Sequence, residues 1–254
     1  MRHLTYKSVL RALTLRFWLA YGRTFFRVKC PLSFLFYYLF KIDEGFPRTF
    51  VFRTPVGIVP LKAFSVEDVI TMFIVFCRNE YNALPAHKLF VDFGANIGIS
   101  AAFFLSRSKD SYVYLFEPNP LNVHRLRDNL KQFDQRFSLE EVAIDTSNGS
   151  IEFGTESTGI YGGISRRFTN GSTIVVKTRD VNEVLTNILN LHQKIDFLKI
   201  DIEEKEREIL PHIRTGILEK VNEIDVETWD FTIQIPGFQR NCYGFILRFK
   251  RENV

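Results

Sequence analysis

Acidic side chains follow two segments that we expect to be strands in the second half of the chain. Asp201 comes directly after the mainly apolar residues 197–200, and Glu227 directly after residues 221–226. The carboxyl ends of parallel strands meet at one edge of a sheet. Glu203 could join this set or simply begin the next helix. Acids gathered there can bind a hard cation, take a proton from a substrate hydroxyl, or hold the cationic end of a cofactor.

A glycine-containing loop follows an earlier apolar run. Asp92 lies within this run, and Gly94, Asn96 and Gly98 come after it. Gly94 permits a tight turn or close approach of a ligand, and Gly98 lets the next helix pack against the strand. The carboxylate of Asp92 could accept a hydrogen bond from an amine-bearing or positively charged ligand. A dinucleotide fingerprint would need G-x-G-x-x-G, so two glycines four positions apart argue against a nicotinamide cofactor.

Glu117 ends the following apolar run, about twenty residues beyond the glycine loop. An acid at this position accepts hydrogen bonds from the two hydroxyls of a ribose. Its neighbours Phe116 and Pro118 argue against a merely solvated carboxylate. We interpret Glu117 as a ligand-binding residue, an interpretation that depends on the α/β fold predicted below. Lys199, inside the run that precedes Asp201, could pair with one of the acids or face solvent.

The spacing of the apolar runs predicts an α/β fold with a doubly wound, mostly parallel sheet. The expected strands and helices alternate: strands at 89–93, 112–116, 137–142, 195–200 and 221–226, helices at 97–105, 121–133 and 203–213. Residues 143–194 look like a long glycine-rich surface insertion, often a lid in enzymes, with a strand at 173–176 and a helix at 181–191. After Trp229 the tail supplies one strand, 242–249, and a poor helix, which predicts an abbreviated sheet edge.

The chain divides into an N-terminal extension, residues 1–87, and a catalytic domain, residues 88–254. The extension contains a basic aromatic segment, two short strands around residue 56, and a helix capped by Ser65. No acidic residue precedes Asp43, whereas eight basic residues do.

Residues 1–40 allow two interpretations. Basic aromatic helices bind membrane surfaces, which would make the protein peripherally membrane-associated. Alternatively, the segment is a helical cap whose aromatic face packs on the catalytic domain, the interpretation that we slightly favour. No apolar stretch approaches the ~20 residues that span a bilayer, and there is no clean signal peptide.

The composition fits a folded chain of one sizeable α/β domain plus an extension. Hydrophobic residues make up 46% and charged residues 24% of 254 residues. A net charge of +4 is too small to argue for a nucleic-acid partner, and none is expected. Cys30, Cys77 and Cys242 lack metal-ligand spacing and favour a reducing, cytoplasmic compartment. The lack of a G-x-x-x-x-G-K-[ST] loop excludes a nucleotide hydrolase of that class.

Four stretches, taken in order, resemble the FkbM-type methyltransferases, class I Rossmann-like enzymes that use S-adenosylmethionine. VDFGANIG at 91–98 is similar to the family's V-D-x-G-A-N-x-G, and FEPNP at 116–120 to its F-E-P-x-P. DFLKIDIE at 196–203 is similar to D-x-L-K-I-D-x-E, and Glu227 stands where the family has an acid. The likeness spans roughly residues 46–229, and the motifs are specific only when taken together.

The resemblance implies that S-adenosyl-L-methionine binds at the first strand ends. The cofactor-binding set comprises Asp92, Gly94, Asn96, Gly98, Glu117 and Ala143. It also implies that Asp201 lies close to the transferred methyl, with Glu227 and Glu203 as further catalytic candidates. The implied reaction is methyl transfer to a hydroxyl of a sugar, glycan or secondary metabolite. The acceptor, a need for a divalent metal and the oligomeric state stay open.

One departure concerns the residue after D-x-E. The family usually has Gly there and an acid two positions later; this chain has Glu204, and Glu206 keeps the acid. A charged side chain there could narrow the pocket. A catalytically silent cofactor-binding or scaffold protein is therefore the alternative function.

Overall fold

The computed structural model describes residues 15–155, 162–163, 172–202 and 205–252. The chain forms two compact units, residues 1–82 and residues 83–254. Glu203 and Glu204, singled out above, lie outside the described residues.

The first unit is built on a β-hairpin. Strands β1 (Arg48–Thr54) and β2 (Gly57–Ala63) pair antiparallel, with Thr54 opposite Gly57 across the predicted turn. The helices are α2 (Leu15–Arg27), α3 (Pro31–Phe40) and α4 (Val66–Met72), which continues as a π-helical turn, η1 (Phe73–Cys77). Ser65 caps α4 as predicted: its hydroxyl accepts from the Asp68 amide, and the Asp68 carboxylate accepts from the Ser65 amide.

A seven-stranded sheet forms the centre of the second unit. Its order is β12-β13-β11-β10-β3-β4-β5, in which β13 runs antiparallel to its neighbours and all other pairings are parallel. The strands are β3 (Leu89–Phe93), β4 (Tyr112–Phe116), β5 (Phe137–Glu140), β10 (Ile195–Ile200), β11 (Val221–Glu227), β12 (Phe238–Tyr243) and β13 (Ile246–Arg251). The predicted doubly wound α/β fold is confirmed.

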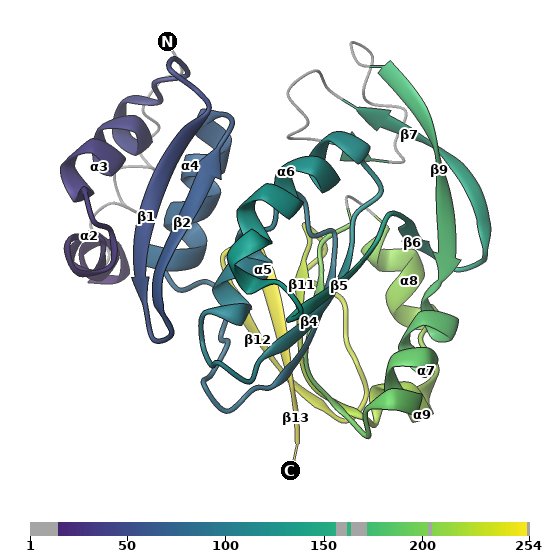
Figure 1. Ribbon diagram of the computed structural model, residues 1–254. Helices are drawn as coiled ribbons and strands as arrows, with labels where there is room; N and C mark the ends of the chain where they lie inside the picture. The colour runs from purple at the N-terminus through teal and green to yellow at the C-terminus, as the bar shows by residue number, and fades with distance from the viewer. Residues whose placement is uncertain (1–14, 156–161, 164–171, 203–204, 253–254) are drawn as a thin grey trace. The chain divides into compact units, whose positions relative to one another are not determined.

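Helices cover both faces of this sheet (Figure 1). Helices α5 (Ile99–Leu105) and α6 (Pro120–Leu130), the latter ending in a 3₁₀ turn, η2 (Lys131–Phe133), lie on one face. On the other face lie α7 (Val181–Leu191), α8 (Glu206–His212) and α9 (Thr215–Leu218). The chain moves from β3 toward β5 in one direction and from β10 toward β11 in the other. The boundary between β3 and β10 is therefore the topological switch point, where open α/β sheets bind ligands.

In its described residues, the insertion between β5 and β10 contains more strand than the sequence suggested. Its strands form a second sheet, β6-β9-β7-β8, from β6 (Ala143–Asp145), β7 (Gly149–Thr155), β8 (Gly162–Gly163) and β9 (Ser172–Asp180). Strands β7 and β9 pair antiparallel from Gly149 opposite Thr178 to Thr155 opposite Ser172. The strand expected at 173–176 and the helix expected at 181–191 are present, in β9 and in α7. The pairing of β7 with β9 was not expected, and it satisfies the backbone groups of both strands.

The carboxyl-terminal tail also differs from expectation. Residues 242–249 are not one strand: a turn at Gly244, with a φ of 67°, divides β12 from β13. The short tail therefore supplies both final strands, β12 and β13. Among the described residues no helix lies between β11 and β12, where the sequence predicted a poor one. The sheet edge is complete rather than abbreviated.

Candidate active site

Three loops emerge side by side at the switch point. Phe93, the last residue of β3, pairs with Ile200 of β10 and with Phe116 of β4. Gly94, Asp201 and Glu117 directly follow these three residues, so the strand register brings their backbones together. The carbonyl of Phe116 accepts the amides of Gly94 and Ala95 at 3.0 and 3.1 Å. Ile200 also pairs with Val226, which places Glu227 next along the same edge.

A buried lysine joins two of the predicted acids. Lys199 Nζ lies 2.9 Å from Asp92 Oδ1 and 3.2 Å from Asp201 Oδ2. It also donates to the carbonyl of Gly94 at 2.8 Å. The other oxygen of Asp92 accepts the hydroxyl of Ser100 at 2.5 Å. Of the two alternatives for Lys199, the structure shows the buried ion pair.

The electrostatics of this cluster favour a charged lysine. Burial by itself favours the neutral amine, but attraction to Asp201, Asp92 and Glu227 outweighs it and raises the pKa of Lys199. Burial raises the pKa of Asp92, and the Lys199 ammonium and Ser100 hydroxyl oppose that rise. One ammonium between two carboxylates leaves the strand edge with excess negative charge.

The Asp92 side chain has no exposed surface, and both of its oxygens have partners. Its observed contacts position Lys199, and a direct contact between Asp92 and a ligand stays a prediction. Asp201 differs, because its side chain is 31% exposed and reaches the edge of the sheet. Glu227 is exposed at the end of β11.

Gly94 lies where no side chain fits. Its φ is +84°, and a Cβ atom there would come within 1.8 Å of the carbonyl oxygen of Asp201. Gly98 also has a φ of +84°, and its added Cβ would meet Leu126 and Leu130 at 3.1 and 3.3 Å. We had expected Gly98 to pack closely against the strand. Its close contact is instead with α6. Both glycines allow the loop to stay close to neighbouring elements.

The carboxylate of Glu117 organises the glycine loop from the next strand. Its Oε2 accepts the amide of Asn96 at 2.8 Å, and its Oε1 accepts the amide of Asn119 at 2.9 Å. Burial raises the pKa of Glu117 to about 7, although these backbone amides favour the carboxylate. Asn96 itself has a φ of 48°, a left-handed conformation that Asn tolerates better than most residues.

Unpartnered acceptors surround Glu117. The side-chain oxygens of Asn96 and Asn122 are buried and have no hydrogen-bond partner among the described residues. Unsatisfied buried acceptors are costly, so native sites with them usually await a donor. Asn122, on α6, was not anticipated, because an Asn inside a helical run has no distinctive sequence pattern.

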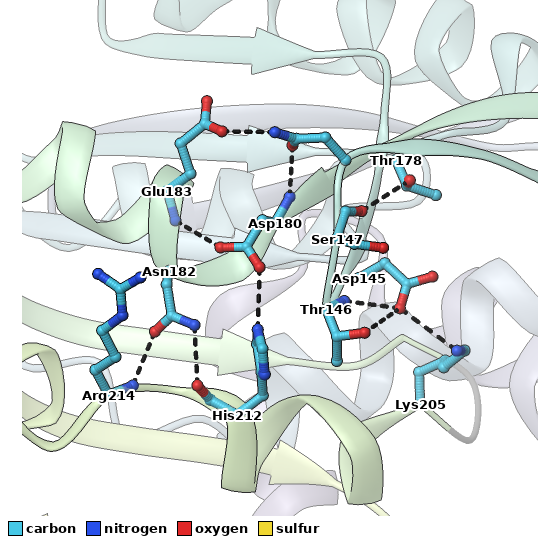
Figure 2. Close-up of polar contacts among 11 residues, drawn as sticks. Asp145, Thr146, Ser147, Thr178, Asp180, Asn182, Glu183, Lys205, His212 and Arg214 are labelled. Carbon is cyan, nitrogen blue, oxygen red and sulfur yellow. Dashed lines mark hydrogen bonds and ion pairs between the residues drawn. The ribbon is translucent and has the colours of Figure 1, made fainter.

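A second ionic contact joins the second sheet to the start of α8. Asp145, at the end of β6, lies 3.4 Å from Nζ of Lys205, which precedes α8 (Figure 2). The same carboxylate accepts the amide of Thr146 at 2.7 Å. Ala143, predicted to bind the cofactor, lies in β6 and packs with Phe153 and Val176. Its contact with a cofactor stays a prediction.

The start of α7 is anchored to the end of α8 (Figure 2). Asp180 caps α7 by accepting the amide of Glu183 at 2.9 Å and lies 3.0 Å from Nε2 of His212. Asn182 donates to the carbonyl of His212 and accepts the amide of Arg214. These contacts hold the helices that frame β10, the strand that carries Asp201.

The acids do not form a metal cluster in the described part of the chain. There, no group of three His, Cys, Asp or Glu side chains lies close enough to hold an ion. The cation beside Asp201 is instead the ammonium of Lys199.

Comparison with known proteins identifies the family. Residues 92–249, more than half of the chain, match the Methyltransferase FkbM domain. The chain belongs to the FkbM family of methyltransferases. Its matched region contains the glycine loop, Glu117 and the Lys199 cluster.

The names of two curated relatives state a methylation reaction, one at an oxygen and one on a hexuronic acid. The chain is 38% identical over 100 residues to the 2-O-methyltransferase NoeI of Sinorhizobium fredii, covering 35% of this chain and 41% of that protein. It is 27% identical over 136 residues to the hexuronic acid methyltransferase AglP of Haloferax volcanii, covering 54% of each. The chain thus spans about half the length or less of these relatives. A Streptococcus mutans protein solved with SAH has a TM-score of 0.40 and 10% identity, covering 67% of this chain and 92% of that one.

Proposed function

We propose that this FkbM-family protein transfers the methyl group of S-adenosylmethionine to a hydroxyl of a sugar or glycan. The observation that carries the cofactor assignment is the set of acceptors around the glycine loop. The Glu117 carboxylate, which can accept about four hydrogen bonds, receives three, from the Asn96 and Asn119 amides and the Asn122 side chain. The side-chain oxygens of Asn96 and Asn122 have no partner among the described residues. A ribose diol and an amino group supply the hydrogen-bond donors that such a set requires.

The charge of the switch point supports the same cofactor. S-adenosylmethionine supplies an electrophilic methyl group on a positively charged sulfur. Asp92, Asp201 and Lys199 together carry one excess negative charge at the ends of β3 and β10. Such a cluster complements a sulfonium better than the diphosphate of a dinucleotide.

In this proposal Asp201 is the base. The acceptor oxygen forms a bond to the methyl carbon as the carbon–sulfur bond breaks, and the electron pair of that bond stays on sulfur. The hydroxyl proton passes to the partly exposed carboxylate of Asp201. Lys199 holds this carboxylate in place from its buried side. Since the displacement is in line, most of the rate enhancement comes from positioning, and the base only removes the proton.

Trp229 offers a surface for the acceptor. It lies two residues beyond Glu227, is 76% exposed, and its ring centroid is 4.2 Å from that of Phe245. An indole combines a large apolar face with a polar N–H, which suits a sugar ring with a C–H face and a hydroxyl rim. The name of AglP, a hexuronic acid methyltransferase, supports a sugar as acceptor for this chain, and the name of NoeI, a 2-O-methyltransferase, supports transfer to an oxygen.

Calorimetry and a turnover assay test the proposal. Wild-type protein should bind S-adenosylmethionine, and Glu117→Ala should weaken binding by at least ~10-fold, the effect of losing ~1.4 kcal/mol. Glu152→Ala, an exposed acid on β7, is the matched control and should bind normally. Unchanged affinity in Glu117→Ala would refute the ribose assignment.

Turnover is measured with methyl-labelled cofactor and a panel of hexoses, hexuronic acids and oligosaccharides. Label should appear in at least one sugar. Cofactor binding with no methylation of any sugar would contradict the acceptor class and favour the catalytically silent alternative.

A further inference from the structure

Helix α2 turns large apolar side chains away from the core of its unit. Ala20 and Thr24 are fully buried, whereas Trp18, Phe25 and Phe26 are 63%, 51% and 80% exposed. With 3.6 residues per turn, the exposed and buried sets lie on opposite sides of the helix. A surface helix ordinarily presents polar side chains to water. The outward side of α2 is instead aromatic.

Helix α3 repeats this arrangement. Phe34 is buried, whereas Leu32, Phe36 and Phe40, spaced one turn apart, are 73%, 50% and 67% exposed. Phe36 and Phe40 contact each other, with ring centroids 5.2 Å apart. These exposed side chains form one apolar row on the helix.

The buried sides of both helices meet the same core residue. Phe73 of η1 contacts Tyr21 of α2 at a centroid distance of 5.6 Å and stacks on Tyr38 of α3 at 4.0 Å. The aromatic residues of these helices are therefore divided between a packed core and an outer side. We call the six exposed side chains of α2 and α3 named above the outer face. These six exposed apolar residues fall within residues 18–40, whereas single scattered ones are usual on a soluble domain.

Positive charge accompanies the outer face. Residues 1–82 contain twelve Lys and Arg against five Asp and Glu, whereas the remaining residues contain 21 against 24. Exposed Lys29 and Lys41 flank α3 at its two ends. Exposed Arg53 donates to the carbonyls of Phe26 and Val28 at the end of α2. Cations thus border the apolar side chains.

We propose that the outer face binds the surface of a bilayer that contains anionic lipid. Trp and Phe side chains prefer the boundary between headgroups and acyl chains, and bordering Lys and Arg pair with anionic headgroups. The contact would be peripheral, because no helix in the described part of the chain is long and apolar enough to cross a membrane. This inference does not depend on the proposed reaction.

Vesicle sedimentation tests the inference on the full chain. The probes are vesicles of phosphatidylcholine alone and of equal parts phosphatidylcholine and phosphatidylserine. Wild-type protein should sediment with the anionic vesicles, more weakly with the neutral ones, and less in high salt. The triple variant Phe26→Ser, Leu32→Ser, Phe40→Ser should lose ~100-fold or more in vesicle affinity.

The matched control is Val175→Ser with Leu191→Ser, two side chains of the second unit that are 73% and 74% exposed. It should bind vesicles like the wild type. Equal circular dichroism and melting temperature of all three proteins check that the fold is kept.

Three outcomes overturn the proposal. They are no binding of the wild type to anionic vesicles, equal binding by the triple variant, or equal loss in the control. Failure to bind vesicles together with a concentration-dependent dimer that the triple variant abolishes would assign the outer face to a second copy of the chain. Failure to bind vesicles in a strictly monomeric wild type would favour packing against the catalytic domain.

Discussion

The ammonium of Lys199 lies 2.9 Å from Oδ1 of Asp92, its register partner on the neighbouring strand β3. Neither side chain is more than 3% exposed. The same ammonium holds the carbonyl of Gly94 and the carboxylate of Asp201. A single buried cation therefore sets the relative position of the glycine loop and the proposed base.

Lys199→Met should destabilise the protein by about 3–5 kcal/mol, because it leaves a buried carboxylate without its counter-charge. Asp92→Asn combined with Lys199→Met should recover part of this loss, since the uncompensated charge is then gone. Urea denaturation of the two single variants and the double variant measures the coupling. If the losses in the two single variants add up to the loss in the double variant, Lys199 and Asp92 have no coupling energy.

Gly94→Ala should abolish cofactor binding and lower stability. The added methyl group would meet the backbone oxygen of Asp201 at 1.8 Å, and the φ of +84° disfavours any L side chain. Gly216→Ala is the control, because no atom lies within 4 Å of its added Cβ. It should unfold at or slightly above the wild-type midpoint. A Gly94→Ala protein with wild-type melting temperature and affinity would contradict the close approach of the two strand ends.

The strands of the catalytic edge could be predicted to the residue. Segments 89–93, 112–116 and 195–200 are mostly apolar runs, interrupted only by Asp92, Asp196 and Lys199, as expected for parallel strands covered on both faces. The strand expected at 173–176 lies within β9, but its pairing with β7 was missed because glycine-rich turns dominate the local sequence pattern. The terminal hairpin was missed because Gly244 sits inside a run that reads as one strand.

The chemistry of the site was only partly predictable. Acids at strand ends are visible in sequence, and Glu117 and Asp201 do lie at neighbouring strand ends. The pairing of Lys199 with Asp92 depends on the register of strands 107 residues apart, which no local pattern encodes. For the same reason, the full burial of Asp92 could not be foreseen from its place before a glycine.

Stability should fall between about pH 4 and pH 7 through Glu117. Burial raises its pKa to about 7, so the folded protein keeps this proton at pH values where the unfolded chain, with a pKa of ~4.3, has lost it. The loss should reach about 3 kcal/mol over this range. The side chain that Glu117→Gln introduces cannot titrate. The free energy of unfolding of this variant should therefore increase relative to that of the wild type as pH rises. If the free energies of unfolding of the wild type and of Glu117→Gln, measured by denaturant titration, change with pH in parallel, the carboxyl group of Glu117 has an ordinary pKa.

Asp201→Asn should lower kcat by ~10²–10⁴-fold, the usual contribution of a general base. Its affinity for S-adenosylmethionine should change little, because the amide keeps the size of the side chain. Glu227→Gln provides the comparison, since Glu227 ends the neighbouring strand and is the other described catalytic candidate. If Glu227→Gln loses turnover and Asp201→Asn does not, the base is Glu227.

Trp229→Ala should raise KM for the best sugar of the acceptor panel by about tenfold, the effect of losing ~1.4 kcal/mol of stacking. Affinity for S-adenosylmethionine and kcat at saturating sugar should stay near wild type, because the exposed ring belongs to the acceptor side of the proposed site. Trp229→Phe should restore much of the acceptor affinity by returning an aromatic face beside Phe245. Leu191→Ala, a similarly exposed residue on α7, should leave both substrates unaffected. Equal KM values in Trp229→Ala and wild type would remove Trp229 from the acceptor site and leave the sugar to be bound elsewhere along the strand edge.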